Sequence, residues 1–237
     1  MQIKSRGRGE RAANMPRIAL AKPRDSPDRE AMTVLPSRVA IAVPSGDMVH
    51  ADFSMALAEL CHRVHGMAVT LISVKSSIIA LARNNAVDLA QKAGAEHLLF
   101  LDSDMVFPAG ALHRLLAHQV DIVGATYVKR VAPHDLLGTK LDIPPADAPE
   151  GLIEMQRIPT GCLLIRMSVF ERLSKPYFDF ATDPETGVIH GEDYVFCDRA
   201  RAAGFRIWCD AALTGELGHI GQRVHRLKDY LPKGAET

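Results

Sequence analysis

The fold of this chain is decided by the stretch His97-Leu98-Leu99-Phe100-Leu101-Asp102-Ser103-Asp104. Residues 98–101 are apolar without a break, and a strand of this kind has cover on both faces, as in the centre of an α/β sheet. The polar residues that follow leave the sheet at the carboxyl end of this strand. Open α/β sheets bind ligands at that edge, so Asp102 and Asp104 are the first candidates for a functional site.

Strand and helix patterns alternate on both sides of this stretch. Short apolar runs predict strands, and apolar residues spaced by three and four predict amphipathic helices. The predicted strands are 38–43, 69–73, 97–101, 121–125, 161–165 and 205–208, and the predicted helices are 53–64, 76–92, 108–116, 169–173 and 192–203. This alternation predicts the α/β class: one domain built on a Rossmann-like, mostly parallel sheet with helices on both faces.

Three of the predicted helices have local start signals. Ser76 or Ser77 is expected to cap the second helix, and Pro108 suits the first turn of the third. Ser168 and Glu171 have the spacing of a capping box at the start of the fourth helix.

Composition and charge limit the classes of function. Lys+Arg and Asp+Glu both number 28, so no net positive field would attract nucleic acid. No apolar run has the roughly 20 residues that span a bilayer, and residues 1–36 lack the apolar core of a secretory signal. We therefore expect a soluble, cytoplasmic protein with a disordered tail at 1–36, a domain at 37–222 and a polar C-terminal segment at 223–237. Within the domain, the proline-rich residues 129–150 are expected to form a long surface loop.

Asp102 and Asp104 flank Ser103 where the chain leaves the sheet, so both carboxylates can face one cation. Carboxylate oxygens suit Mg²⁺ or Mn²⁺ that is held together with phosphate groups. Two acids in a loop can also form an ordinary solvated turn, because D-x-D alone is a weak motif. Their place after a buried strand favours the metal site.

Three stretches of the chain resemble one known family. They are Arg83-Asn84-Asn85, Leu99-Phe100-Leu101-Asp102-Ser103-Asp104-Met105 and Gly191-Glu192-Asp193. The first two are similar to the nucleotide-sugar half of family 2-like glycosyltransferases, and the third resembles their acceptor-side half. The resemblance implies the A-type glycosyltransferase fold. It also implies transfer of a sugar, such as a hexose, from a nucleoside diphosphate sugar to an acceptor, which can be a glycan, a lipid or a protein.

In this family the D-x-D motif bridges the diphosphate through a divalent cation. By position, the resemblance implies that Asp102, Asp104 and His219 hold the metal, and the histidine favours Mn²⁺ over Mg²⁺. It also implies that Asp193 is the base that takes the proton of the acceptor hydroxyl, with Glu192 in a supporting role and inversion at the sugar. The residues implied for binding the nucleotide sugar are Pro44, Ser45, Arg83, Asp102, Ser103 and Gly161.

Several of these residues also have a purely structural interpretation. Arg83 can pair with an acid of the core, and His219 can be an ordinary loop residue. Glu192 and Asp193 can stabilise the start of their helix through its dipole. For the whole chain, a sugar-phosphate nucleotidyltransferase or an inactive nucleotide-sugar-binding relative remains open. Nucleotidyltransferases generally have a Gly-rich phosphate loop after the first strand, and Pro44-Ser45-Gly46-Asp47 offers no such loop.

Overall fold

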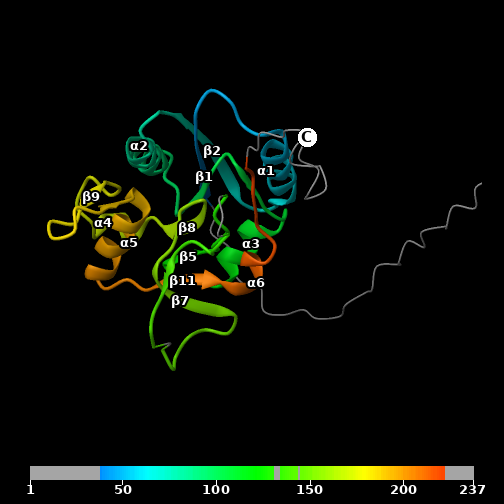
Figure 1. Cartoon of the computed structure of the whole chain (residues 1–237). Coiled ribbons are helices and arrows are strands. Elements are labelled where there is room, and N and C mark those ends of the chain that lie inside the picture. Colours follow the sequence, from blue (N-terminus) through cyan, green and yellow to red (C-terminus); the bar gives the residue numbers. More distant parts are fainter. Residues whose placement is uncertain (1–37, 131–133, 144, 222–237) are drawn as a thin grey trace, which may run out of the picture. The chain divides into compact units, whose positions relative to one another are not determined.

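The stretch that ends at Asp104 forms, as expected, a central strand, β3 (His97–Leu101), of an eight-stranded sheet (Figure 1). The structure is a computed structural model that describes residues 38–130, 134–143 and 145–221. The tail expected at 1–36 and the polar segment expected at 223–237 lie outside these residues. No helix within the described ranges is long and apolar enough to cross a membrane.

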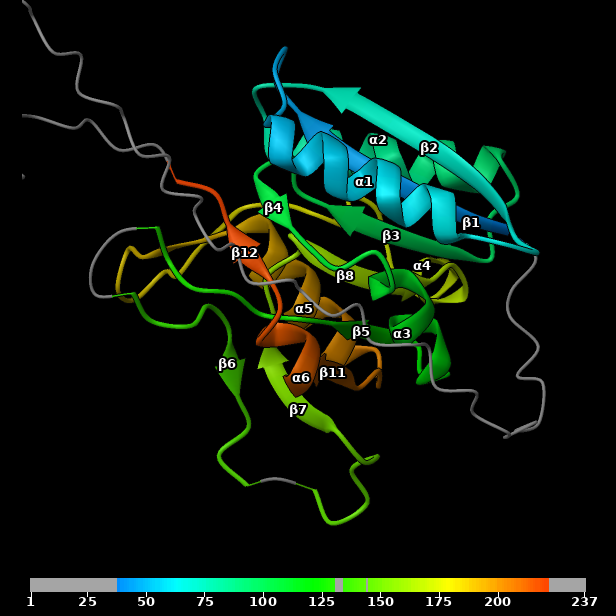
Figure 2. The ribbon, with the colours of Figure 1, turned by 90° about the vertical axis from the view of Figure 1, so that its right-hand side faces the viewer.

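The sheet is mixed, but most of its strands point the same way. Only β8 and β7 run against the other six, as the pairings show. The strand order is β2 (Ala68–Lys75), β1 (Arg38–Ser45), β3, β8 (Cys162–Arg166), β5 (Ile122–Gly124), β11 (Ile207–Asp210), β7 (Leu152–Arg157) and β6 (Thr139–Lys140) (Figure 2). The predicted α/β class with a mostly parallel sheet is therefore confirmed.

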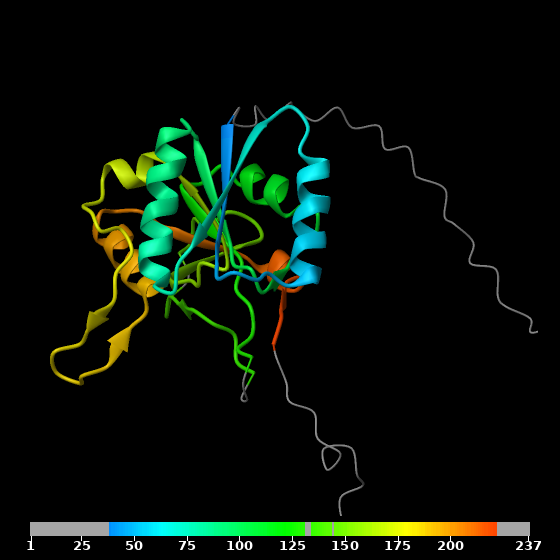
Figure 3. The same ribbon diagram turned by 90° about the horizontal axis from the view of Figure 1, so that it is seen from above.

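Helices cover both faces of the sheet, which is why β3 is apolar on both sides. In the view from above, α1 and α2 lie on opposite sides of β1 and β2 (Figure 3). One buried cluster contains residues of α2 (Ile79–Lys92), α4 (Ser168–Glu171) and α5 (Glu192–Ala202). The other contains residues of α1 (Ala51–Arg63), α3 (Ala111–Ala117) and α6 (Ala211–Thr214). Alternate residues of β1 enter the two clusters, since successive side chains of a strand point to opposite faces.

β8 is the strand that positions the site. It lies between β3 and β5 and is antiparallel to both, so its first residue, Cys162, pairs with the last residue of β3, Leu101. Two short ribbons complete the described strands. β4 (Met105–Val106) pairs with β12 (Gly218–His219), and β9 (Ala181–Thr182) pairs with β10 (Ile189–His190).

The three predicted helix starts are wrong. α2 begins at Ile79 with no side-chain cap, because the Ser76 hydroxyl accepts the Ile78 N–H in a turn before the helix. α3 begins three residues after Pro108, which instead opens a turn closed by the Ala111 N–H. The Ser168 capping box does not form either, since Met167 is the N-cap residue of α4 and no side chain caps it.

Two strands of the eight-stranded sheet in the second half were not predicted, and neither were the short strands β9, β10 and β12. β6 falls inside the expected loop at 129–150, and β7 follows it. β7 carries Glu154, which is buried and forms ion pairs with Arg201 and Arg206. The sequence of β7 is therefore polar although the strand is largely buried, and it lacks the apolar run that predicts a buried strand. At the other end of the sheet, β1 extends through Pro44 and Ser45, which were expected in the loop after it.

Candidate functional site

The carboxyl ends of β1 and β3 meet at one polar cleft. The two strands are parallel neighbours, with Ala42 of β1 opposite Phe100 of β3, so the residues that follow them leave the sheet side by side. A cleft of about 250 Å³ opens there, and it is lined by Pro44, Ser45, Gly46, Ser76, Ile79, Asp102, Ser103 and Asp104. The structure therefore brings together five of the residues singled out in the sequence.

Gly161 lies beside this cleft because β8 is antiparallel to β3. The Asp102 N–H donates to the Gly161 carbonyl at 3.1 Å, and the Gly161 N–H donates to the Tyr127 hydroxyl at 3.2 Å. A Cβ atom at Gly161 would lie only 2.3 Å from that hydroxyl oxygen. Close packing against Tyr127 thus accounts for the glycine, and its contact with a donor remains a prediction.

Arg83 is buried beneath the cleft, with its side chain only 4% exposed. Its Nε donates to Glu192 Oε1 at 2.9 Å, and its Nη2 donates to both carboxylate oxygens of Asp102 at 3.0 and 3.2 Å. Burial works to lower the pKa of Arg83, but the two carboxylates more than offset it, and the pKa is raised. In this structure Arg83 is therefore paired with acids of the core, which is the structural interpretation given above.

One nitrogen of Arg83 is left over. Its Nη1 is buried and has no hydrogen-bond partner among the described residues. A buried donor without a partner is costly. This atom is the part of Arg83 to which an additional acceptor could be bound.

Glu192 and Asp193 open α5 after Gly191, but their surroundings differ. Glu192 is buried and paired with Arg83. Asp193 has no ion-pair partner within the described part of the chain and accepts the N–H of Tyr194 at 2.8 Å. Burial, followed by the charge of Glu192, raises the pKa of Asp193 to about 6. The Asp193 carboxylate therefore has an increased affinity for a proton near neutral pH.

Asp104 and His219 are brought together by the ribbon of β4 and β12, in which His219 pairs with Met105. Asp104 Oδ2 lies 3.5 Å from His219 Nε2 and 2.8 Å from Arg130 Nη1. On the other side of the imidazole, His219 Nδ1 lies 2.8 Å from the Val128 carbonyl oxygen. A carbonyl can only accept, so Nδ1 is the donor, and in a neutral imidazole Nε2 then carries the lone pair.

The donor set at Asp104 and His219 fits a divalent cation in part. An imidazole whose Nδ1–H is held by a backbone carbonyl has its Nε2 oriented as in many metal sites. This Nε2 faces a carboxylate oxygen, an arrangement that a shared cation would stabilise. Asp102, however, is turned to Arg83, and the described residues contain no group of three or more metal-ligating side chains close enough for one ion.

Arg130 is the residue of this site that sequence reasoning missed. It lies in the segment expected to be a loop, and nothing in its local sequence indicates a contact with a residue 26 positions away. Arg83 and Glu192 are 109 positions apart, so the local sequence does not indicate their pairing either.

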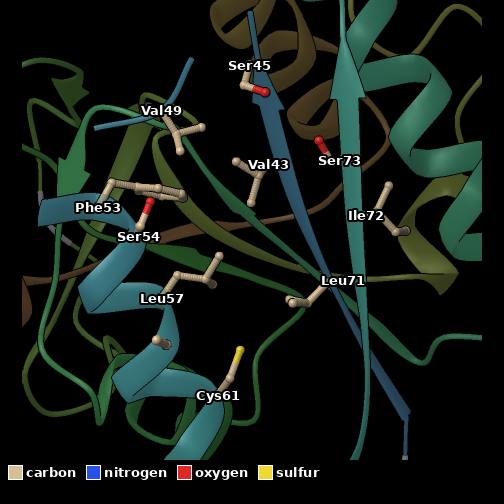
Figure 4. A pocket seen from close by; sticks show the side chains of 11 residues that line it. Val43, Ser45, Val49, Phe53, Ser54, Leu57, Cys61, Leu71, Ile72 and Ser73 are labelled. Atoms are coloured by element: carbon tan, nitrogen blue, oxygen red, sulfur yellow. The ribbon is translucent and has the colours of Figure 1, made fainter. Parts of the chain in front are cut away.

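A second, apolar cavity of about 390 Å³ borders the cleft through Ser45. It lies between α1 and the strands β1 and β2 (Figure 4). Phe53, Leu57 and Leu71 are among its lining residues, and Leu71 lies on the edge strand and is 55% exposed. The apolar lining distinguishes this cavity from the acidic cleft.

Comparison with known proteins supports the fold alone. No family model matches the sequence, and no curated protein matches it. Among solved structures, A197 from STIV aligns with a TM-score of 0.52 and 16% identity over 82% of this chain and 100% of A197. A mannose-1-phosphate geranyltransferase from Thermus thermophilus aligns with a TM-score of 0.39 and 13% identity, over 60% of this chain and 61% of that protein. The first likeness shows a shared fold, and the second is too low to indicate more.

Proposed function

We propose that this chain is a glycosyltransferase of the A-type fold that uses Mn²⁺ or Mg²⁺ to transfer a sugar from a nucleoside diphosphate sugar to an acceptor hydroxyl. The observation that carries this proposal is the polar cleft in which Pro44 and Ser45 meet Asp102, Ser103 and Asp104. Sheets of this class bind ligands at that edge, and a cleft lined by two carboxylates suits a cation with phosphates.

In this proposal the nucleotide lies on Pro44 and Ser45, with Ser103 and the edge at Gly161 bordering the sugar. Arg83 acts from below the cleft. It donates to both oxygens of the Asp102 carboxylate, whose remaining lone pairs would accept from the ribose hydroxyls. The unpartnered Nη1 of Arg83 is a donor available to an oxygen of the nucleotide sugar.

Asp104 and His219 would hold the cation, with Asp102 beside them. The Val128 carbonyl orients His219 by accepting from Nδ1, so that Nε2 faces Asp104. When bound, the cation supplies positive charge that stabilises the departing diphosphate.

Asp193 is the proposed general base. The acceptor oxygen forms a bond to the anomeric carbon, the bond from that carbon to the diphosphate oxygen breaks, and the acceptor proton passes to Asp193. A carboxylate with a pKa of about 6 is a stronger base than an ordinary aspartate and is still ionised at pH 7. Attack from the face opposite the diphosphate gives inversion. Glu192 supports the step by holding Arg83.

A thermal-shift screen tests donor binding. A nucleoside diphosphate sugar that binds only the folded chain raises Tm, and we expect this rise with Mn²⁺ or Mg²⁺ but not with EDTA. Asp104→Asn and His219→Ala should lose the rise. Asp121→Asn is the matched control, because Asp121 is a half-exposed acid paired with Arg166 before β5, at the opposite edge of the sheet.

Turnover with the donor identified in the screen tests the reaction itself. We expect release of nucleoside diphosphate, reduced by roughly a hundredfold or more in Asp104→Asn, since charge stabilisation of a leaving group is commonly worth about 3 kcal/mol. Release of pyrophosphate from a sugar phosphate and a nucleoside triphosphate would replace the proposal with a nucleotidyltransferase. If the donor binds equally well in EDTA, the proposed requirement for a divalent cation is wrong.

A further inference from the structure

We propose that Arg130 binds the diphosphate of the donor, a role that rests on the proposed function. Arg130 Nη1 donates to Asp104 Oδ2 at 2.8 Å, and Asp104 lines the polar cleft. The Arg130 side chain is 50% exposed, whereas that of Asp104 is 23% exposed. The guanidinium therefore lies at the rim of the cleft, on the solvent side of the carboxylate.

The backbone directly before Arg130 is held in place. Val128 forms a β-bridge with Leu136, and the Lys129 N–H donates to the Asp135 carbonyl at 2.9 Å. The Arg130 stem also packs beside Gly221, where an added Cβ would lie 3.7 Å from it, an ordinary contact distance. Arg130 is thus carried by a paired segment that directs it toward Asp104.

The nearby cations are less suited to this role. Arg83 is 4% exposed and already paired with Asp102 and Glu192. Lys75 is the last residue of the edge strand β2, and its Nζ lies 3.3 Å from Asp47. Within the described residues, Arg130 is the exposed arginine that contacts the D-x-D acids. A guanidinium also matches two phosphate oxygens at once, which a lysine ammonium cannot do.

In this proposal Arg130 exchanges its ion-pair partner Asp104 for the diphosphate when the donor binds. A partly exposed ion pair contributes little to stability, so it can be broken at small cost. When the donor enters, Arg130 moves from Asp104 to the diphosphate, and Asp104 becomes available for the cation. As the sugar–phosphate bond breaks, its electron pair stays on the diphosphate oxygen, and Arg130 lies where that negative charge develops.

Calorimetric binding of nucleotides tests this assignment without turnover. UDP and GDP, each with its nucleoside monophosphate, are titrated in Mn²⁺ into the full chain and into Arg130→Ala, Arg130→Lys and Arg38→Ala. We expect diphosphate affinity to fall roughly 10- to 100-fold in Arg130→Ala, with a change of about threefold or less for the monophosphate. Arg130→Lys should recover part of the affinity, because it keeps the charge but loses the two-point contact.

Arg38→Ala is the matched control. Arg38 is also a partly exposed arginine in an ion pair, with Glu96, but it lies at the amino end of β1. Its loss should leave every affinity unchanged. Diphosphate affinity in Arg130→Ala equal to that of the original chain would overturn the assignment, as would an equal loss for diphosphate and monophosphate. If the original chain binds no nucleotide at all, the proposed function fails and this inference fails with it.

Discussion

At the scale of single residues, the clearest feature is the contrast between two neighbouring acids. Glu192 neutralises Arg83, whereas Asp193 is partly buried and lies beside a carboxylate. Burial and like charge both favour the protonated form of Asp193, which is why its pKa is raised to about 6. Two acids at one helix start thus have separate roles, which their shared position in the sequence does not distinguish.

This pKa predicts the pH dependence of transfer. A base must be deprotonated to accept a proton, so the transfer rate should rise as pH increases through about 6 and level off above it. Asp193→Asn should lower the rate by roughly 10²- to 10⁴-fold and abolish that step in the profile. Rates measured over the acid to neutral range with a true acceptor, at saturating donor, provide the test. If Asp193→Asn transfers sugar at the rate of the original chain, Asp193 is not the base and only stabilises the start of its helix.

Stability against pH gives an independent check on the same residue. A carboxyl whose folded-state pKa is raised contributes stability that is present below its ordinary value of 3.8 and lost as pH rises through about 6. The free energy of unfolding of the original chain should therefore fall relative to that of Asp193→Asn over this interval. Parallel curves for the two proteins would contradict the raised pKa.

At the scale of elements, Arg83 joins three parts of the fold. It belongs to α2, its Nη2 holds Asp102 after β3, and its Nε holds Glu192 of α5. Removing one member of a buried charge cluster leaves the others without compensation. The same residue that orients the D-x-D motif is thus expected to stabilise the packing of α2 and α5.

We expect Arg83→Met to lower the free energy of unfolding by about 3 to 5 kcal/mol, because two carboxylates then lose their cation. The double variant with Glu192→Gln should lose less than the sum of the single variants, since they share one interaction. Denaturant unfolding of the four proteins measures this coupling. Arg38→Ala, with a partly exposed ion pair, should lose about 1 kcal/mol or less. Additive losses would show that Arg83 and Glu192 act separately.

The elements that the sequence predicted are those with a local signal. β3 was predictable because four apolar residues in a row require cover on both faces. β7 was not, because Glu154 owes its burial to arginines about 50 positions away. The helix starts failed for a related reason: turns before Ile79 and Ala111, and not side-chain caps, begin those helices.

The residues of the site also fall into those that the sequence predicted and those that it did not. Asp102 and Asp104 could be found from their position after a buried strand, and the structure places them in one cleft with Pro44 and Ser45. The contact of Arg130 with Asp104 and the pairing of Arg83 with Glu192 depend on tertiary structure, and no local pattern encodes them. Strand direction is likewise absent from a local pattern, so the strand at 161–165 was predicted but its antiparallel direction was not.

At the scale of the whole molecule, the sheet is completed late in the sequence. β3 and β5 precede β8 in the chain, yet they are joined only through it, with five residue pairs to β3 and three to β5. We predict that a fragment of residues 1–160, which lacks β8, shows no cooperative thermal unfolding and is digested by protease at concentrations that leave the full chain intact. Cooperative melting of this fragment would show that the first part of the chain folds by itself.

The late position of β8 has a consequence for synthesis on the ribosome. After Gly124 has been made, Arg166 follows 42 residues later, which takes roughly 2 to 8 s at bacterial or eukaryotic elongation rates. During that interval one edge of β3 lacks its hydrogen-bonding partner, and unpaired strands of this kind associate readily with other chains. The yield of folded protein in cells is therefore expected to depend on how nascent-chain chaperones shield β3 until β8 emerges.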